Sequence, residues 1–270
     1  MLTNAQIKEI KKLNEKSKAR REAGLFVIEG PRMFLETPLE WVKQVYVTNE
    51  FLEQADNGVL TDGSTNIRAK EMIQWMEHTV ITAEQMSRIS DTQTPQGIMC
   101  IVKQPSYTLE DIISDDRENG LYMVLEDIQD PGNLGTIFRT AEGAGVKGII
   151  LSRGTVDIFN PKTIRSTMGS IYRVPFLYVE NLHETINKMK SMDIKVYAAH
   201  LKGEKYHDEE HYGRCAFLIG NEGNGLKKET ADLADTYIKI PMSGKLESLN
   251  AAVASAILMY EYERQTRKCR

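Results

Sequence analysis

The sequence of 270 residues has little cysteine, no long apolar run and no large excess of charge of either sign. Its three cysteines, Cys100, Cys215 and Cys269, lie far apart and form no C-x-x-C pair, which argues against a disulfide framework and a structural zinc site. We therefore expect a reducing cytoplasm and no bound metal. Because no apolar run approaches about 18 residues and the charged N-terminus has no signal-like apolar stretch, we expect a protein that neither enters a membrane nor is secreted.

The overall charge is weakly acidic, with 34 Lys and Arg against 38 Asp and Glu, a net charge of −4 and a pI near 5.8. This balance argues against bulk electrostatic attachment to nucleic acid or to an anionic membrane. Residues 7–22 are a local exception, because seven basic residues there face three acidic ones and give a net charge of +4. The composition, with 41% hydrophobic and 27% charged residues, is that of a globular protein of one or two domains.

The chain is expected to divide into an N-terminal domain over residues 1–105 and a C-terminal domain over residues 106–270. The first half reads as a small mixed α/β unit, with strands at 25–29, 42–47 and 98–102 and helices at 7–22, 32–36 and 70–76. A polar, proline-containing stretch over 103–120 marks the boundary.

The second half alternates apolar strands with helical patterns, which predicts an α/β domain with a mostly parallel sheet covered on both faces. Its strands are expected at 121–125, 148–151, 194–199, 216–219 and 237–240, and its helices at 134–144, 161–168 and 249–264. Ligands of such sheets bind beyond the carboxyl ends of strands, so the loops after residues 125, 219 and 240 are the places where a site is expected.

The first of these loops, residues 126–133, leads into a helix on which Gly135, Arg139 and Glu142 share one face. Arg139 therefore emerges over a turn that glycine leaves bare. An ordinary surface ion pair between Arg139 and Glu142 is the simpler alternative for this loop taken alone.

The second loop, residues 220–225, has three glycines in six residues, as suits a backbone that approaches a ligand closely. Its order is G-x-x-G-x-G after a late strand, so it fails the context of a dinucleotide fingerprint, and a plain glycine-rich turn is the alternative. The third loop, residues 241–250, enters a helix that Ser248 is expected to cap. An apolar stripe on that helix is expected to allow close helix or subunit contact: Leu249, Ala252, Val253, Ala256, Ile257 and Tyr260.

Two acidic or histidine-containing clusters are set aside as sites. His207 and His211 have the i, i+4 spacing of a zinc helix, but the glutamate does not follow the first histidine directly and the surroundings are polar. The pairs Asp115-Asp116 and Glu209-Glu210 are expected to be solvated charges.

Three motifs occur in order along the second half. They are Asn133-x-Gly135-x-x-x-Arg139-Thr140-Ala141, the stretch LIGNEGNGL at 218–226, and Ile240-Pro241-Met242 followed by SLNAAVA at 248–254. Together they resemble the three signature motifs of the SpoU/TrmH family of SPOUT RNA 2′-O-ribose methyltransferases. FVIEG at 26–30 and TPQGI at 94–98 resemble that family's N-terminal substrate-binding domain, which is similar to a small RNA-binding ribosomal protein. NPKTIRSTMGS at 160–170 resembles a segment of its ribosomal RNA methyltransferases.

The resemblance implies a SPOUT domain with a trefoil knot, a homodimer formed through that domain, and S-adenosyl-L-methionine as cofactor. Knots are so rare that no argument from sequence pattern predicts one. Carried over by position, cofactor contacts fall on Gly220, Ile240 and Leu249. The catalytic set falls on five residues: Asn133, Arg139, Glu222, Ser248 and Asn250.

Because guanidinium stays protonated, Arg139 is expected to orient the ribose hydroxyl and stabilise developing alkoxide, while a phosphate or Glu222 accepts the proton. RNA contacts are expected from the basic N-terminal segment and from the 160–170 segment: Lys11, Lys12, Lys18, Arg20, Arg21 and Arg165. Ribosomal RNA is the favoured substrate. Three alternatives remain open: transfer RNA as substrate, a non-catalytic RNA- or ribosome-binding protein, and, more remotely, a nicotinamide-dependent oxidoreductase.

Overall fold

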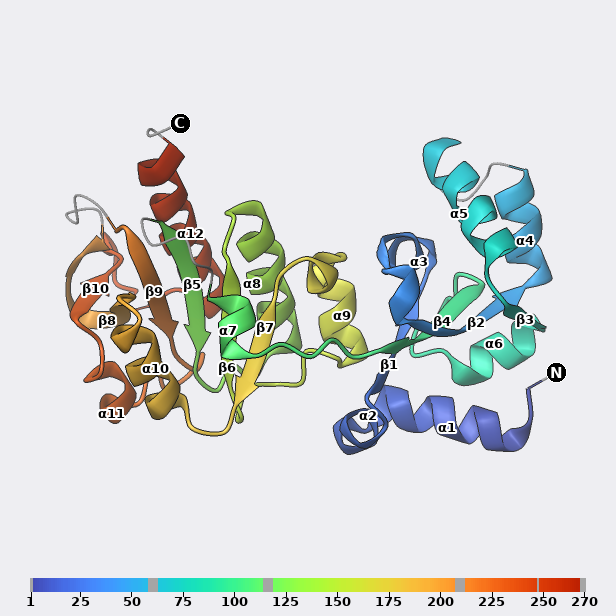
Figure 1. Cartoon of the computed structure of the whole chain (residues 1–270), viewed down its shortest axis with the longest axis horizontal. Helices are drawn as coiled ribbons and strands as arrows, with labels where there is room; N and C mark the ends of the chain where they lie inside the picture. The colour runs from blue at the N-terminus through green and yellow to red at the C-terminus, as the bar shows by residue number, and fades with distance from the viewer. Residues whose placement is uncertain (1, 58–62, 114–118, 207–211, 247, 268–270) are drawn as a thin grey trace. The chain divides into compact units, whose positions relative to one another are not determined.

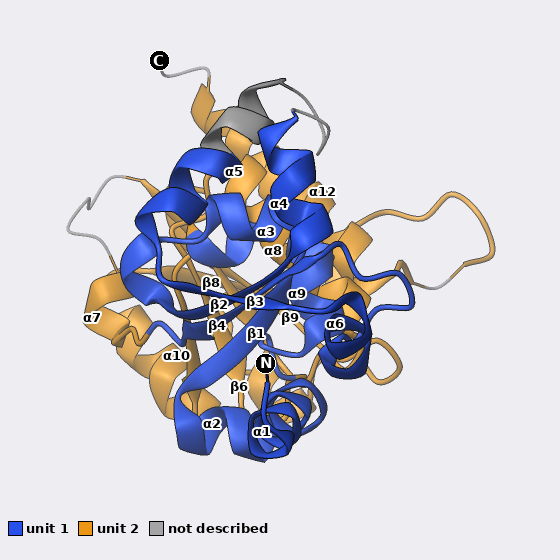
Figure 2. Ribbon diagram, turned by 90° about the vertical axis from the view of Figure 1, so that its right-hand side faces the viewer, with its two compact units in different colours: residues 1–105, 157–172 blue, residues 106–156, 173–270 orange. Residues whose placement is uncertain are grey.

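A computed structural model describes residues 2–57, 63–113, 119–206, 212–246 and 248–267, which form two compact units (Figures 1 and 2). Unit 1 comprises Met1–Pro105 and Asp157–Tyr172, and unit 2 comprises Ser106–Val156 and Arg173–Arg270. The segment Asp157–Tyr172, which the sequence prediction assigns to the second domain, thus belongs to unit 1. Cys269, the acidic pairs at 115–116 and 209–210, and the histidines at 207 and 211 lie outside the described residues.

Unit 1 is built on a mixed sheet in the order β1-β4-β2-β3, in which β4 is antiparallel to β1 and β2, and β2 is parallel to β3. Its strands are β1 (Leu25–Glu29), β2 (Val42–Thr48), β3 (His78–Ile81) and β4 (Ile98–Lys103). Its helices are α1 (Asn4–Glu15), α2 (Ser17–Ala23), α3 (Pro31–Glu36), α4 (Asn49–Asp56), α5 (Gly63–Trp75), α6 (Ala83–Ile89) and α9 (Pro161–Thr167), with short 3-10 turns at Leu39–Trp41 and Ser170–Tyr172.

The basic segment folds as two helices rather than the single helix predicted over 7–22. A capping box starts α1, in which the Gln6 backbone N–H donates to Thr3 Oγ1 (3.3 Å) and the Thr3 N–H donates to Gln6 Oε1 (2.9 Å). The apolar residues of α1, spaced three apart, are buried against the sheet: Ile7, Ile10 and Leu13. At Lys16 the backbone turns extended and the second helix begins.

Arg20 is a structural residue of unit 1. The residue is 2% exposed. Its guanidinium pairs with Asp157 (Nη2 to Oδ2, 2.7 Å) and donates to the carbonyl oxygens of Leu13 and Asn14 at 2.7 and 3.0 Å. The ring of Phe26 contacts Phe159 nearby, with 4.8 Å between their centroids. These contacts attach the segment that begins at Asp157 to the N-terminal helices and β1.

Unit 2 is built on a six-stranded sheet in the order β10-β8-β9-β5-β6-β7, and every pair of neighbours is parallel, as predicted. Its strands are β5 (Gly120–Leu125), β6 (Gly148–Ser152), β7 (Phe176–Val179), β8 (Lys195–Lys205), β9 (Arg214–Ile219) and β10 (Thr236–Lys239). Its helices are α7 (Leu109–Ile112), α8 (Pro131–Gly143), α10 (Leu182–Ser191), α11 (Lys228–Ala231) and α12 (Ala251–Arg267).

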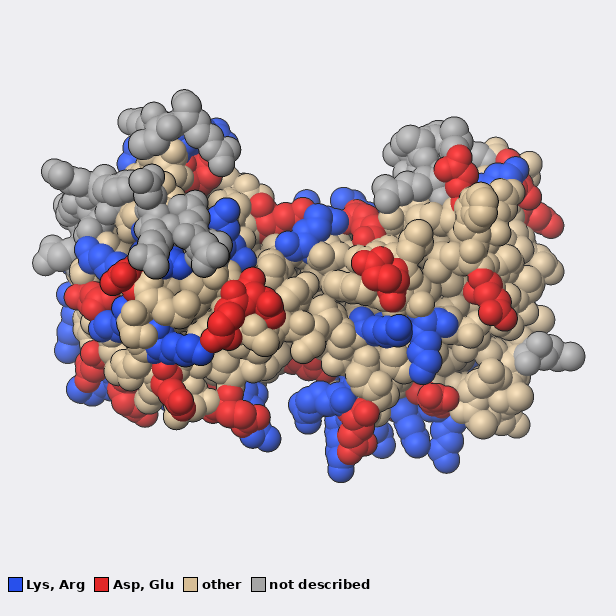
Figure 3. Space-filling view, viewed as in Figure 1, with Lys and Arg blue, Asp and Glu red and all other residues tan. Residues whose placement is uncertain are grey.

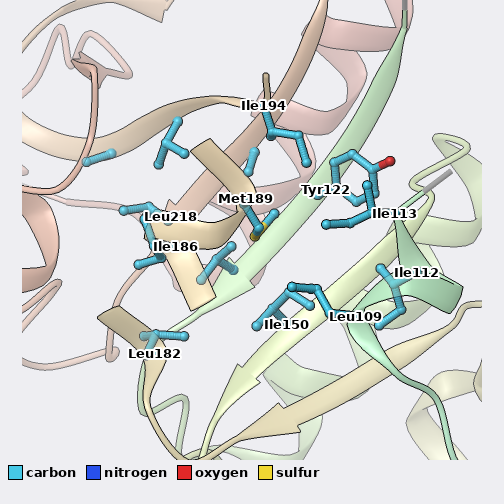
Figure 4. Packing of buried hydrophobic residues seen from close by; sticks show 14 of the residues in the cluster. Leu109, Ile112, Ile113, Tyr122, Ile150, Leu182, Ile186, Met189, Ile194 and Leu218 are labelled. Carbon is cyan, nitrogen blue, oxygen red and sulfur yellow. The ribbon is translucent and has the colours of Figure 1, made fainter. Parts of the chain in front are cut away.

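One buried cluster covers a face of this sheet (Figure 4). Leu182, Ile186 and Met189 of α10 pack there against strand residues such as Ile150 and Leu218. Leu109, Ile112 and Ile113, which come directly after the boundary at residue 105, belong to the same cluster, so this stretch is part of the unit 2 core and not a free linker. Within the described ranges, no helix is long and apolar enough to span a membrane.

The order of the strands fixes where a ligand site is expected. β5 continues through α8 to β6 on one side, whereas β9 continues to β10 on the other side. The adjacent strands β5 and β9 therefore form a topological switch point, and the loops after them diverge and leave a crevice at the carboxyl edge of the sheet.

Candidate active site

The loops after β5 and β9 are joined by the carboxylate of Glu222. Its Oε2 accepts the backbone N–H of Gln129 (3.0 Å), and its Oε1 accepts the backbone N–H of Asp130 and the side-chain amide of Asn133, both at 3.0 Å. Asp130 in turn caps α8, because its Oδ1 accepts the Asn133 N–H at 2.8 Å. One carboxylate thus fixes the start of the helix that carries Arg139.

Asn133 extends this chain to the third motif. Its Oδ1 accepts a hydrogen bond from the Asn250 side-chain amide at 2.9 Å. The Asn250 Oδ1 accepts the backbone N–H of Ala252 (2.9 Å) and of Val253 (3.3 Å), so Asn250 caps α12. The prediction that Ser248 caps this helix is wrong, because α12 begins at Ala251 and the capping side chain is that of Asn250. Glu222, Asn133 and Asn250, one from each predicted motif, form one connected set that we call the motif bridge.

The protonation state of Glu222 follows from these contacts. Partial burial raises the pKa of its carboxyl, but the hydrogen bonds from Asn133, Asp130 and Gln129 together outweigh burial, so the pKa lies below its usual value. The group is an anion at neutral pH with its lone pairs largely engaged. It is built to hold the two loops together and is a weak base.

Asp127, which the sequence prediction missed, anchors the loop after β5 to Ser152 and Lys227. Its backbone has φ +55°, and Ser152 Oγ both accepts the Asp127 N–H (2.8 Å) and donates to its Oδ1 (2.7 Å). Lys227 Nζ donates to its Oδ2 at 2.7 Å. The bond from Lys227 is the main cause that lowers the pKa of Asp127, against partial burial. The signal that the sequence offered was an Asp two residues after a buried strand and shortly before a proline-containing turn, a position where Asp tolerates the positive φ that the structure shows.

The glycine-rich loop folds back on itself. Asn221 and Gly225 exchange backbone hydrogen bonds at 3.1 and 2.9 Å, and Asn221 Oδ1 accepts the N–H groups of Gly223 and Asn224. A Cβ on Gly220 would lie 2.1 Å from the backbone of Gly225, so the tight return requires glycine there. The Asn221 amide donates to the Asp127 carbonyl at 2.9 Å and ties this loop to the one after β5.

A cavity of about 320 Å³ opens beside the glycine-rich loop. The three predicted cofactor residues, Gly220, Ile240 and Leu249, all line it, as do Ser248 and Glu222. The remaining wall comes from residues 199–201 of β8, from 221 and 223–226, from Ile238, Lys239 and Met242, and from Ala251 and Ala254 of α12. The sequence prediction did not include the β8 wall, in which His200 packs on Tyr237 with 4.8 Å between ring centroids.

Arg139 is exposed on α8, and among the described residues no hydrogen bond or ion pair engages its guanidinium. The simpler alternative of an Arg139–Glu142 pair is not what the structure has, because the Glu142 carboxylate is held by Arg173, whose Nη2 donates to Oε2 at 3.1 Å. The predicted catalytic residues therefore fall into two groups. Glu222, Asn133 and Asn250 hold one another, whereas Arg139 and Ser248 are exposed without a bond partner among the described residues.

The predicted RNA contacts differ in accessibility. Lys11, Lys12, Lys18 and Arg21 are exposed, and basic side chains project along the lower edge of unit 1 below α1 and α2 in Figure 3. The prediction that Arg20 contacts RNA is wrong. Its guanidinium is buried, where it pairs with Asp157 and donates to backbone carbonyls, so it cannot reach a phosphate. Arg165 is half-buried and pairs with Asp91 at 2.9 Å.

Comparison with known proteins decides the family. A model described as the SpoU rRNA Methylase family matches residues 120–260, and one described as the MRM3-like substrate binding domain matches residues 4–100. The chain belongs to the SpoU rRNA methylase family. It is 32% identical over 258 residues to the 23S rRNA (guanosine(2553)-2'-O)-methyltransferase RlmP of Bacillus subtilis, with 95% of each chain covered.

Two solved methyltransferase structures with bound AdoMet, one of them described as a SpoU methyltransferase, are similar over almost the whole chain. The rRNA methyltransferase from Sinorhizobium meliloti has a TM-score of 0.81 and 31% identity, covering 98% of this chain and 96% of the other. AviRb from Streptomyces viridochromogenes has a TM-score of 0.84 and 25% identity, covering 99% and 100%. The resemblance drawn from the three motifs is thereby confirmed, together with the fold class, the enzyme class and S-adenosylmethionine as the family's cofactor. No group of His, Cys, Asp or Glu side chains suited to a metal ion occurs in the described part of the chain.

Proposed function

We propose that this SpoU methylase transfers the methyl group of S-adenosylmethionine to a ribose 2′-hydroxyl of ribosomal RNA. The observation that carries the proposal is the motif bridge, which ties the first motif to the two motifs that line the cavity, while no described residue engages the Arg139 guanidinium. The curated relative of Bacillus subtilis carries a 23S rRNA 2'-O-methyltransferase name and matches the chain over nearly its full length.

The residues of the cavity suit S-adenosylmethionine. Ile240, Leu249 and Met242 give an apolar surface for an adenine ring, and the glycines at 220 and 225 leave backbone groups open to polar atoms. Glu222 supplies a negative charge at the rim, which suits a cationic sulfonium. When bound, S-adenosylmethionine supplies a methyl group that the sulfonium already activates.

The protein's own residues then have to place a hydroxyl and dispose of one proton. Arg139 orients the ribose hydroxyl and stabilises the alkoxide that develops on it. Asn133 and Asn250 act as positioning residues through the motif bridge. The hydroxyl of Ser248, which is exposed at the cavity, forms a hydrogen bond with the ribose. Both carboxylate oxygens of Glu222 already accept hydrogen bonds from the loop after β5, so Glu222 is not placed to take the proton. We assign the proton to a phosphate oxygen of the RNA beside Arg139, which takes it as the O–CH3 bond forms.

RNA reaches unit 1 through the exposed basic face of α1 and α2. The apolar side of α1 is committed to the core, so Lys11, Lys12, Lys18 and Arg21 are left for phosphates. Arg165 joins them once an RNA phosphate competes with Asp91.

The working molecule is a cytoplasmic homodimer with a trefoil knot in unit 2. Val253 and Tyr260 of α12 are 48% and 49% exposed, with half-buried Ala256 and Ile257 between them, which leaves an apolar stripe for a second copy. The opposite side of α12 is buried and packs on α8, so the predicted stripe lies mainly outside the core. The support for the knot is membership of the SpoU family, for which a knotted domain is expected.

The proposal is tested by incubating the protein and labelled S-adenosylmethionine with 23S rRNA and with transfer RNA, both from cells that lack this gene. We expect label in a 2′-O-methylated nucleotide of 23S rRNA and none with Arg139→Ala. Label in transfer RNA alone would establish the other substrate. RNA binding without transfer by the wild-type protein would establish a non-catalytic role.

A further inference from the structure

A second cavity, of about 370 Å³, lies within unit 1, apart from every residue of the motif bridge. It is bounded by the first turn of α3, by α4, by α6 and by the loop before β4. Its lining consists of Pro31, Thr48, Glu50, Phe51, Gln54, Ala83, Met86, Ser87, Pro95, Gln96 and Gly97. The volume is in the range of pockets that hold a small molecule or part of a larger one, about 300–1,000 Å³.

The chemistry of this cavity is polar but almost uncharged. Gln54 and Gln96 are exposed, and among the described residues neither amide has a hydrogen-bond partner. Phe51 and Met86, each 1% exposed, form an apolar floor. No Lys or Arg occurs among the described residues that line it, and Glu50 would repel an anion, so a phosphate is a poor occupant.

The loop that carries Gln96 is fixed before anything binds. The carboxylate of Glu29 accepts hydrogen bonds from Ser90 Oγ (2.7 and 2.8 Å) and Thr92 Oγ1 (2.6 Å), which holds the loop that carries Gln96. Gly97 in that loop has φ +76°, and a Cβ there would lie 2.9 Å from Thr48 Oγ1 and Phe51 Cβ. A rigid loop presents its side chains in one geometry, which favours recognition of a ligand with a defined pattern of donors and acceptors.

From this cavity we infer that unit 1 reads an unpaired nucleobase of the RNA, with Gln54 and Gln96 contacting the base edge. The inference rests on the proposed function, because it takes RNA as the substrate. A planar group with an apolar face and a hydrogen-bonding edge matches an apolar floor beneath two amides that no described residue engages, each with donors and an acceptor. Proteins read RNA sequence mainly from unstacked bases in loops and bulges, which fit such pockets.

A contact to a base and a contact to a phosphate change RNA binding in different ways, and the test measures this difference. A phosphate contact adds to the salt dependence of binding, whereas a base contact adds preference for one nucleotide with little salt dependence. The probe is a pool of short RNA hairpins with randomised loops, selected on the full-length wild-type protein and on Gln54→Ala/Gln96→Ala. Gln74→Ala is the matched control, since Gln74 is an exposed glutamine of unit 1 outside the cavity.

We expect the wild type and Gln74→Ala to enrich one base at one loop position and the double variant to lose that enrichment. The double variant should bind the selected hairpin at least about fivefold more weakly with an unchanged salt slope, as for loss of a base contact. Gln54→Met/Gln96→Met, which keeps side-chain length, should give the same result, and unchanged thermal unfolding and S-adenosylmethionine binding exclude misfolding.

Three results would overturn the inference: no base preference in the wild type, an unchanged preference in both double variants, or a loss of affinity with a reduced salt slope. None of them touches the proposed function, which is measured separately as methyl transfer to 23S rRNA. Absence of methyl transfer by the wild type would sink the proposed function even if the base preference were present.

Discussion

Two arginine-bearing regions, one in each unit, show opposite uses of the same side chain. In unit 1, Arg20 lies in a run of basic residues that predicts RNA binding. Its guanidinium instead forms an ion pair with Asp157 and donates to two backbone carbonyls. In unit 2, Arg139 stands on a helix where an ordinary ion pair with Glu142 was the simpler expectation, yet Arg173 occupies that carboxylate and Arg139 is exposed. The comparison teaches that charge density in sequence does not locate a functional cation. What locates it is whether the fold has already satisfied the charge.

Breaking the Arg20 side of the comparison is expected to have the largest effect. Arg20→Ala leaves Asp157 without its partner in a mostly buried position, and removing one member of such a pair costs about 3–5 kcal/mol. Denaturant unfolding should show this loss against Lys18→Ala as control, because the pair of Lys18 with Glu22 is exposed. The folded fraction should bind RNA with an unchanged salt slope. A slope reduced by about one would instead make Arg20 a phosphate contact.

Breaking the Arg139 side should slow methyl transfer strongly and leave folding intact. Arg139→Ala removes one preorganised donor for developing alkoxide, a loss of about 10²–10³ in turnover by analogy with oxyanion donors. Steady-state methyl transfer measures it, and thermal unfolding should match the wild type. Lys147→Ala, at an exposed basic residue just after α8, is the matched control. Near-normal turnover by Arg139→Lys with unchanged RNA affinity would contradict the orienting role.

Cutting the motif bridge should have the next largest effect. Glu222→Gln keeps the size of the side chain but removes the negative charge that three donors bind. The loops after β5 and β9 should then shift relative to each other. Misplacement of this kind costs about 10²-fold in rate. Glu229→Gln, also exposed in unit 2 but outside the bridge, should be silent. An unchanged turnover of Glu222→Gln would show that the bridge does not position the reacting groups.

The same variant gives a pH test of the role of Glu222. Because the folded-state pKa is depressed below the usual 4.5, the stability that the carboxylate adds is complete above the unfolded-state pKa and is lost as pH falls through the folded-state pKa. The difference in unfolding free energy between wild type and Glu222→Gln should therefore be constant near neutrality and shrink below about pH 4.5. A difference that changes between pH 6 and 8 would mean a raised pKa and would revive Glu222 as proton acceptor.

The exposed basic face of α1 and α2 carries the smallest expected effect. Replacing Lys11, Lys12, Lys18 and Arg21 together by Gln should weaken RNA binding and reduce the salt slope by about 0.7–0.9 for each phosphate contact that is lost. Glu9→Gln/Glu15→Gln on the same helix should strengthen binding slightly and serves as control. Deletion of residues 1–22 is not a usable test, because Ile7, Ile10 and Leu13 belong to the core of unit 1.

Strands with long apolar runs could be predicted from the sequence, whereas the short strands and the cap of α12 could not. The strands beginning near 25, 98, 121, 148 and 216 lie within a few residues of their predicted bounds, because their apolar runs are buried on both faces. β3 and β7 were missed, since each has four residues and a partly exposed pattern. The cap of α12 was misplaced because Ser248 and Asn250 are both good capping residues, and the fold alone selects Asn250.

Sequence by itself determined the family, because the three motifs occur in the chain in the order that the family requires, and it proposed the residues of the candidate site. It could not determine which of them are engaged. Glu222 lies 89 residues from Asn133, and Asn250 lies 117 residues from it, so their bonds exist only after β5 and β9 have paired. Tertiary structure decided that the Glu222 carboxylate joins two loops, that Arg20 forms an internal ion pair and that no described residue engages Arg139. Each outcome depends on burial and on partners that local sequence does not encode.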